Sequence, residues 1–530
     1  MSVTTMKTPG VYIQELDAFG NAIVPVPTAI PAFIGYTDNI SYNGKNLVNQ
    51  PVRVDSFAEF RSIFGSHPPQ VQFEVINISD VPENAVKPDK DFSANGIDFA
   101  ITNATVNYRL FSAIRFFYEN GGGSCYIVST GSYDYTLQSL NSTTPFENAL
   151  TVLEKEAEPT IIVIPDAVEL INTLGTDLKT KYALSYKLQS EMINHCGKLA
   201  NRVAILDIPG GYNEPIVGET SVEGFRNNVE PKLAKFNSYA VAYYPWLNTS
   251  VNQLSDVSYL NISEKSYDTV ITMLNKEFPE VINSNDDSLS DNPIKPNIEA
   301  LFNVNNTVEE SIKDNADSVL KNLSKSYKIM LDHLLEKINL IPPSSAMAGI
   351  YNSVDNNEGV WVAPANVGIQ GVISPSIKID TRAQEDLNVP LDGKSICAIR
   401  SFTGRGVLVW GARTLDGNSN DWRYINVRRT LIYIEQSIKE AARAYVFAPN
   451  DSSTWVSVKS MISNFLVGLW NQGGLVGPKP TDAFSVSVGL GSTMTPEDIH
   501  EGKMNVSVKV AVSHPAEFIE INFQQEMQKA

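Results

Sequence analysis

The sequence predicts a mixed α/β (α+β) protein of several domains, with a largely parallel α/β sheet in the middle of the chain, a C-terminal α+β domain and extended arms at both termini. The length of 530 residues exceeds what one hydrophobic core usually holds. Between residues 36 and 247, apolar runs of strand length alternate with amphipathic helical segments. Near the C-terminus, apolar and polar residues alternate strictly, as in a strand with one buried face.

Changes in composition along the chain indicate five parts. We expect an N-terminal extended arm, an α/β domain with a surface insertion at residues 66–95, a variable and acidic outer insertion, a further domain and a C-terminal β-arm. In the same order, these parts cover residues 1–35, 36–247, 248–340, 341–502 and 503–530.

Composition excludes several classes of protein. With 41 Lys and Arg against 59 Asp and Glu, the net charge of −18 disfavours a general surface for nucleic acid or anionic membranes. The first ten residues lack the pattern of a secretory signal, and no apolar run reaches the length of a membrane span, so neither is expected. Cys125, Cys196 and Cys397 are far apart and odd in number, which indicates buried thiols in a reducing compartment.

The N-terminal segment combines a short strand-like run at residues 11–16 with prolines at Pro25, Pro27 and Pro31. Proline has a fixed φ and no N–H, so this spacing keeps the chain extended. From the residues alone, an arm and an edge strand of the chain's own domain are equal alternatives. Further on, Asp55 or Ser56 is expected to cap a short helix.

The middle of the chain alternates between helices and strands. Continuous apolar strands separated by amphipathic helices are typical of a buried, largely parallel sheet. The expected helices cover residues 104–119, 145–156, 180–200 and 222–235, and the expected strands cover residues 125–128, 161–164, 203–206 and 238–244.

Asp166 and Asp207 each follow one of these strands, where open α/β sheets bind ligands. Two carboxylates there are candidates for a general acid and base, or for magnesium ligands. The sequence offers no phosphate-binding glycine loop and no histidine pattern beside them, so helix capping is the favoured interpretation. Cys125 opens an apolar strand and is expected in the core, and no metal or cofactor is expected.

The segment 248–340 differs from its neighbours. Asn, Asp and Ser dominate residues 281–292, which favours an exposed loop. A long helix is expected over residues 307–338. After it, residues 407–410 are expected to form a buried strand, followed by helices at 427–446 and 454–470.

The C-terminal stretch contains two strand-like runs. Val506, Val508 and Val510 lie on one face of the first run, and Ile519 and Ile521 lie on one face of the second. Between the runs, His514 and Pro515 interrupt the ladder, because proline has no N–H to donate. A final strand of this kind pairs either inside its own domain or with another chain, and the run itself does not decide which.

Several blocks of sequence occur in an order that resembles one known family. They are P-P-S-S-A-M-A-G-I-Y from Pro342, I-R-S-F-T-G-R-G-V-L-V-W-G from Ile399, W-R-Y-I-N-V-R-R-T-L from Trp422, Y-V-F-A-P-N-D from Tyr445 and N-Q-G-G-L-V-G from Asn471. With T-P-G-V-Y-I-Q-E from Thr8, they resemble the sheath protein of contractile phage tails and contractile injection systems. Residues 66–95 and 248–335 match nothing in that pattern.

The resemblance implies a structural subunit without enzymatic activity. Such a subunit polymerises as stacked hexameric rings around an inner tube and contracts to drive the tube through a target envelope, and residues 341–502 then form the domain that faces the tube. The implied strand-exchange residues are Val11, Ile13, Val506, Val508, Val510, Ile519 and Ile521. The implied arm hinges are Pro25, Pro27, Pro31, His514 and Pro515.

Two basic residues, Lys439 and Arg443, are the tube-contact candidates that the resemblance implies. The alternative is that they are helix C-terminal charges that interact favourably with the helix dipole. An α/β enzyme using Asp166 and Asp207, or a tube or shell protein that never contracts, are the alternative functions.

The implied partners are other copies of the chain, the inner tube protein, and baseplate and terminal cap proteins, with paralogous sheath subunits as further candidates. Nucleic acid and membrane insertion are not expected. Assembly is expected in the bacterial cytoplasm without a signal peptide, as part of a phage tail or tail-like particle. Whether that particle is released from the cell is left open.

Overall fold

The structure is a computed structural model that describes residues 22–213, 219–278, 281–282, 289–290, 294–302 and 308–520. The chain divides into two compact units, whose boundaries fall after Val26, after Arg429 and after Ser513. The smaller unit holds residues 430–513 and the segment up to Val26, and the larger unit holds the rest.

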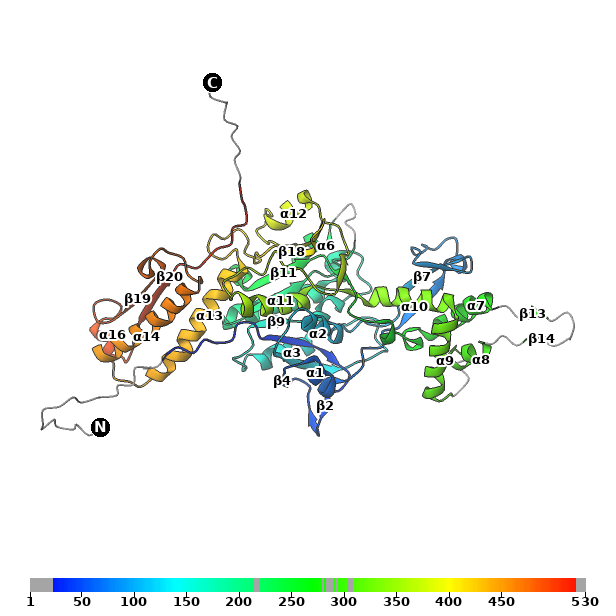
Figure 1. Cartoon of the computed structure of the whole chain (residues 1–530), viewed down its shortest axis with the longest axis horizontal. Coiled ribbons are helices and arrows are strands. Elements are labelled where there is room, and N and C mark those ends of the chain that lie inside the picture. Colours follow the sequence, from blue (N-terminus) through cyan, green and yellow to red (C-terminus); the bar gives the residue numbers. More distant parts are fainter. Residues whose placement is uncertain are drawn as a thin grey trace, which may run out of the picture. The chain divides into compact units, whose positions relative to one another are not determined.

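The larger unit is built on an eight-stranded sheet with the strand order β18-β17-β11-β10-β9-β1-β8-β4 (Figure 1). Six neighbouring strands, from β17 to β8, are parallel, whereas β18 and β4 pair antiparallel at the two edges. This confirms the predicted, largely parallel α/β sheet. The strands are β1 (Pro31–Thr37), β4 (Pro51–Val54), β8 (Cys125–Ser132), β9 (Ile161–Val163), β10 (Val203–Asp207), β11 (Ala240–Tyr244), β17 (Cys397–Phe402) and β18 (Gly406–Trp410).

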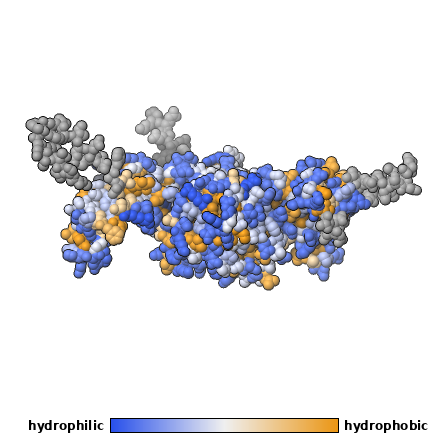
Figure 2. Space-filling view, turned by 90° about the horizontal axis from the view of Figure 1, so that it is seen from below, coloured by the Kyte–Doolittle hydropathy of each residue, from blue (hydrophilic) through white to orange (hydrophobic). Residues whose placement is uncertain are grey.

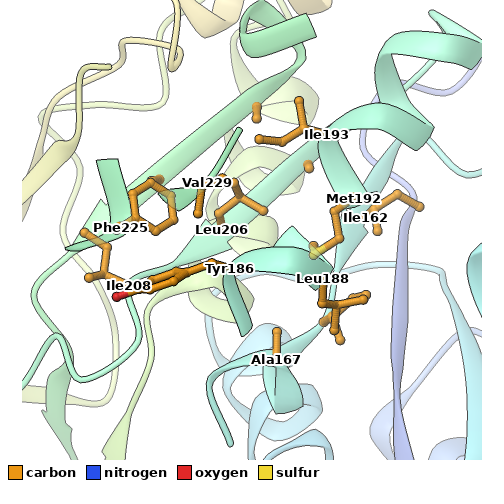
Figure 3. Packing of buried hydrophobic residues seen from close by; sticks show 14 of the residues in the cluster. Ile162, Ala167, Tyr186, Leu188, Met192, Ile193, Leu206, Ile208, Phe225 and Val229 are labelled. Carbon is orange, nitrogen blue, oxygen red and sulfur yellow. The ribbon is translucent and has the colours of Figure 1, made fainter. Parts of the chain in front are cut away.

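Helices cover both faces of this sheet, because successive side chains of a buried strand point to opposite sides. On one face, Leu188 and Met192 of α5 share a buried cluster with Ile162 of β9 and Leu206 of β10 (Figure 3). On the other face, Phe33 of β1 contacts Phe117 of α2. The main covering helices are α2 (Leu110–Glu119), α3 (Thr144–Leu153), α5 (Ala183–Leu199), α6 (Ser221–Asn228) and α11 (Ser344–Asn357).

Strand β1 corrects the predicted extent of the N-terminal arm. Pro31 begins β1 and lies in register with Ile161, and residues 32–34 are completely buried between β8 and β9. Pro31 therefore belongs to the sheet and was wrongly predicted as a hinge. A proline is tolerated as the first residue of a strand, and the short apolar run after it supplies the core.

The two segments predicted as surface insertions share one hydrophobic core. A three-stranded sheet of β5 (Phe73–Asn77), β7 (Ile97–Asn103) and β6 (Phe92–Ala94) packs with four helices in this second cluster (Figure 1). Its buried members come from both segments, including Phe73, Val270, Leu320 and Met330, and from β7 just beyond the first segment, including Phe99. The helices are α7 (Tyr267–Glu277), α8 (Lys295–Phe302), α9 (Glu310–Leu323) and α10 (Lys325–Ile338).

The long helix predicted over residues 307–338 is two helices that meet at Ser324. Ser324 ends α9, and its side chain accepts a hydrogen bond from the N–H of Tyr327 in the first turn of α10. A serine N-cap of this kind begins a new helix. The prediction of a cap at Ser56 is confirmed, because its side chain accepts from the N–H of Glu59 in α1.

The remaining elements of the larger unit are short. They are β2 (Ser41–Tyr42), β3 (Lys45–Asn46), α1 (Phe57–Phe64), α4 (Leu178–Lys181), β12 (Leu247–Thr249), β13 (Val281–Ile282), β14 (Leu289–Ser290), β15 (Leu340–Ile341), β16 (Val372–Pro375) and α12 (Thr381–Asn388). β12, β15 and β16 form a small antiparallel sheet.

The smaller unit consists of two long helices and a two-stranded sheet. Tyr433 of α13 packs against Phe465 of α14, with ring centroids 6.0 Å apart. The elements are α13 (Ile425–Ala442), whose first five residues belong to the larger unit, α14 (Ser452–Asn471), α15 (Pro480–Ala483), β19 (Phe484–Val488), α16 (Pro496–His500) and β20 (Val506–Val510).

The surface is mainly polar. Figure 2 shows a face on which hydrophilic residues predominate and hydrophobic residues form separate patches. In the part of the chain that the structure describes, no helix is both long enough and apolar enough to cross a membrane.

Substitution of two helical glycines tests how closely α11 packs against α2. A Cβ at Gly349 of α11 would lie 2.5 Å from the carbonyl oxygen of Phe117, whereas a Cβ at Gly468 of α14 would meet nothing within 4 Å. We expect Gly349→Ala to lower the free energy of unfolding of the larger unit by about 1–3 kcal/mol through overpacking. Gly468→Ala should raise that of the smaller unit by about 0.5–1 kcal/mol, because alanine favours the helix. Scanning calorimetry of both variants measures this, and a stable Gly349→Ala variant would contradict the close approach of α11 to α2.

Candidate functional site

Asp166 and Asp207 lie just after β9 and at the end of β10, and both are buried. The Asp166 carboxylate accepts hydrogen bonds from the N–H of Tyr36 (3.0 Å) and the N–H of Arg109 (2.6 Å), and Arg109 directly precedes α2. The Asp207 carboxylate accepts from the N–H of Ser344 (2.9 Å) and from its hydroxyl (2.5 Å). Ser344 is the first residue of α11. Both carboxylates therefore satisfy N–H groups at helix starts, as the capping interpretation predicted.

Burial governs the protonation of both acids. It raises the pKa of Asp166 and of Asp207 to about 7, although the hydrogen bonds that they accept act in the opposite direction. Nearby, the buried Arg109 forms an ion pair with Glu169 at 2.7 Å and donates to the carbonyl of Leu340 at 2.7 Å. The polar groups of this cluster are thus engaged with one another and with the backbone.

The other residues considered for chemistry lie in packed surroundings. Cys125, Cys196 and Cys397 are buried free thiols, and burial raises the pKa of each to about 12. Burial and the nearby Arg202 lower the pKa of His195 to about 4. Among the described residues, no group of three His, Cys, Asp or Glu side chains is arranged to hold a metal ion.

The alternating run at the C-terminus forms strand β20, as predicted. Its partner is β19 of the same chain, in antiparallel register with Val508 opposite Val486. Val506, Val508 and Val510 are half-buried, whereas the residues between them are exposed. Pairing of these residues with another chain is not tested by a single chain and stays a prediction.

The sheet of β19 and β20 has only two strands in the described part of the chain, apart from one bridge between Leu475 and Val512 beyond β20. A two-stranded sheet is marginal alone, and an unpaired strand edge is a template for another strand. This sheet is therefore the candidate assembly site, because no third strand of the described residues pairs with it.

The residues predicted for the two arms lie partly outside the described residues and partly next to the boundaries between the two units. Val11, Ile13 and Ile521 lie outside the described residues. Ile519 is 79% exposed and is part of no strand. The chain passes between the two units after Val26 and after Ser513, next to the predicted hinges Pro25, Pro27, His514 and Pro515.

Lys439 and Arg443 lie at the C-terminal end of α13 and in the turn that follows, and both are exposed. Arg443 forms an ion pair with Glu440 at 2.7 Å. Sequence reasoning missed the neighbouring Phe447, which is fully exposed and has φ of +67°. A positive φ at a residue other than glycine has no clear sequence signal.

Sequence reasoning also missed an ion pair between Arg413 and Glu517, whose closest atoms are 2.6 Å apart. The two residues are 104 positions apart, and no spacing rule connects them. The sequence signal for this ion pair was Glu517 itself, a carboxylate at the start of the second C-terminal run.

Comparison with known proteins identifies the fold. A family model described as the phage tail sheath C-terminal domain matches residues 418–526, which include β19, β20 and α14. The sheath complex of an extracellular contractile injection system, PVC, in its contracted state is 25% identical, with 99% of each chain covered and a TM-score of 0.56. Sequence and fold place this chain among the contractile sheath proteins.

Two further relatives agree with this assignment. A chain in the six-fold symmetrised baseplate of the anti-feeding prophage is 25% identical to this sheath protein, covering 99% of this chain and 100% of that one, with a TM-score of 0.55. The tail sheath protein of Vibrio phage KVP40 is 25% identical over 222 residues, which is 39% of this chain. The match spans only 31% of the length of that phage protein. The sheath protein is thus a structural subunit with a mixed α/β fold.

Substitution of Asp207 tests its buried, proton-binding state. Because its pKa is about 7 in the folded state and about 4 in the unfolded state, only the folded state holds the proton between these values. Stability should therefore rise as the pH falls from about 7 to about 4, by up to about 1.4 kcal/mol per pH unit. Asp207→Asn removes this titration. As the pH falls from about 7 to about 4, the free energy of unfolding of the variant should therefore rise less than that of the wild type.

Denaturant unfolding at a series of pH values measures the difference. Asp177→Asn is the matched control, because Asp177 is exposed and hydrogen bonds from Thr180 hold its pKa below the ordinary value. Parallel curves for the wild type and Asp207→Asn would contradict the protonated state of Asp207.

Proposed function

We propose that this sheath protein polymerises as hexameric rings, stacked helically around an inner tube, and that contraction of the polymer drives the tube through a target envelope. The observation that carries the proposal is the similarity over 99% of the chain to the PVC sheath in its contracted state. The similar chain in the six-fold symmetrised baseplate of the anti-feeding prophage supports the hexameric ring and contact with a baseplate. No catalytic step is assigned to the subunit.

Strand addition is the proposed link between subunits. The two-stranded sheet of β19 and β20 acts as the acceptor, and terminal runs of other copies add strands to its edges. The donor residues are Val11 and Ile13 in one arm and Ile519 and Ile521 in the other, while Val506, Val508 and Val510 keep the acceptor strand in register. Backbone hydrogen bonds supply the affinity, and alternate apolar side chains supply the register.

Joints outside the strands allow such links to survive a large rearrangement. The passages between the two compact units, after Val26 and after Ser513, support joints at Pro25, Pro27, His514 and Pro515. In this mechanism the units move as rigid bodies while the links between subunits stay intact. The movement releases the free energy that is stored in the extended polymer.

The proposed partners are further copies of the chain, a tube protein, and baseplate and cap proteins. The proposed location is a phage tail or tail-like particle that is assembled in the bacterial cytoplasm. Lys439, near the end of α13, is proposed to face the tube, and it forms no ion pair among the described residues.

Shortening the C-terminal arm tests strand addition. A chain that ends at Phe518 keeps β19 and β20 but lacks the donor run, so we expect it to form no tubes or stacked rings under conditions in which the full chain does. Ile521→Pro should act in the same direction, because proline cannot donate to a ladder. Ile521→Val keeps the N–H and the apolar side chain and is the control. Negative-stain electron microscopy of the chains, co-expressed with their tube and baseplate proteins, measures the outcome, and normal tubes from the shortened chain would refute strand donation.

Charge reversal at Lys439 tests the tube contact. We expect Lys439→Glu to weaken association with the tube protein by about tenfold at low salt, since one favourable charge contact becomes repulsive. Lys459→Glu on α14 makes the same change at another exposed lysine and should have little effect. The measurement is the amount of tube protein that co-purifies with the sheath protein at two salt concentrations. Equal losses in both variants would remove Lys439 from the interface.

A further inference from the structure

The chain that follows β20 returns to the larger unit before its last apolar run begins. Residues from His514 onward belong to the same compact unit as the eight-stranded sheet. Within this segment, Phe518 and Ile519 are 75% and 79% exposed, whereas Glu517 is half-buried. The segment thus has one inward-facing anchor followed directly by exposed apolar residues.

Donors from three places in the larger unit converge on the carboxylate of Glu517. Arg413 donates through Nη2 at 2.6 Å and through Nε at 3.0 Å, Tyr424 donates its hydroxyl at 2.8 Å, and Asn388 donates its side-chain amide at 2.7 Å. Burial raises the pKa of Glu517, but these hydrogen bonds together outweigh it, and the pKa lies below its usual value. The group is therefore a charged carboxylate at neutral pH.

The Arg413 side chain is only 4% exposed and needs a negative partner. Its Nη1 donates to the carbonyl oxygens of Asn388 and Gly417, both at 3.2 Å. Among the described residues, Glu517 is the carboxylate that pairs with it. Burying a guanidinium without a counter-charge is costly, and Glu517 supplies that charge to Arg413 from the C-terminal segment.

The docked segment also lines a groove. Pro515, Ala516, Glu517 and Phe518 line a cavity of about 870 Å³ together with residues of α12, including Gln384 and Asn388, and with Trp410 at the end of β18. The segment from Pro515 to Phe518 thus lies along a surface of its own subunit.

We propose that Glu517 is a positioning residue that clasps the root of the C-terminal donor strand to the body of its own subunit. This inference rests on the proposed strand addition. With the clasp closed, the donor run from Glu517 to Phe523 reaches about 20 Å, at about 3.3 Å per residue. With the clasp open, the free chain starts after Val512, which still pairs with Leu475, and reaches about 36 Å.

The shorter tether has two consequences for assembly. Only a sheet edge within about 20 Å of the clasp can accept the strand, which restricts the choice of neighbour. The effective concentration of the donor strand at that edge rises about twofold, because it scales as the inverse three-halves power of tether length. The predicted hinge at His514 and Pro515 then lies between the two units of one subunit, and the joint to the neighbour lies after Glu517.

Hydrogen exchange in the isolated full chain tests the clasp directly. Glu517→Gln removes the charge but keeps the size, and the arm is at the surface, so the fold should persist, which circular dichroism checks. We expect amide exchange in residues 514–518 and around Tyr424 to become at least about fivefold faster. Glu520→Gln, the same change at an exposed position of the arm, should exchange like the wild type. Unchanged exchange in Glu517→Gln would overturn the clasp and would leave strand addition untouched.

The yield of polymer tests the positioning role. We expect Glu517→Gln to require about a twofold higher protein concentration for half-maximal polymerisation, measured by sedimentation, and Glu520→Gln to match the wild type. Faster exchange with unaltered polymerisation would overturn the positioning role. Normal polymerisation of the chain that ends at Phe518 would overturn the proposed strand addition itself, so the two failures are distinguishable.

Discussion

A β-strand carries N–H and C=O groups along both edges, and every such row needs partners. The eight-stranded sheet meets this requirement within the chain along the edge formed by β18. Its six parallel strands are flanked by β4 and β18, and residues 366–368 cover the outer edge of β18, where the N–H groups of Asn366 and Val409 donate to Val409 and Val367. The sheet of β19 and β20 does not meet it, because only two strands of the described chain form this sheet. In the described chain, the two-stranded sheet is therefore the one whose edges offer a template for a further strand.

Buried charges hold the closed part together in a particular way. Asp166 and Asp207 accept hydrogen bonds from the starts of the chain segments that enter α2 and α11, and Arg429 pairs with Asp355 at 2.5 Å with both side chains almost fully buried. Each group has a specific partner, so each contributes to a single arrangement of helices on the sheet. Asp166 and Asp207, at this end of the sheet, accept N–H groups where α2 and α11 begin.

The fold was predictable where the pattern of apolar residues was local and long. The strands at residues 161–163 and 203–207 are continuous apolar runs, and the sequence identified them within a few residues. Strand β1 was missed, because its run is short and follows three closely spaced prolines. The break at Ser324 was also missed, since the helical periodicity continues through it and only the cap at the N–H of Tyr327 reveals it.

The candidate site was predictable only in part, because its contacts join distant positions. The alternation at Val506, Val508 and Val510 predicted a strand, but it did not identify Phe484–Val488 as the partner strand. The second core was not predicted, since its buried residues come from two segments, 71–101 and 257–334, that are far apart in the sequence. The pairing of Arg413 with Glu517 depends on the tertiary fold, and the sequence shows only two unrelated charges.

The second core has a consequence for how this protein can diversify. Its strands β5 to β7 come from one excursion of the chain and its helices α7 to α10 from another, with most of the central sheet encoded between or around them. Neither excursion can be deleted or exchanged alone without stripping the cover from the apolar residues of the other. Recombination would therefore have to transfer both pieces together, and a lineage that loses one must lose its companion. The two segments would therefore be inherited together, although they are separate in the sequence.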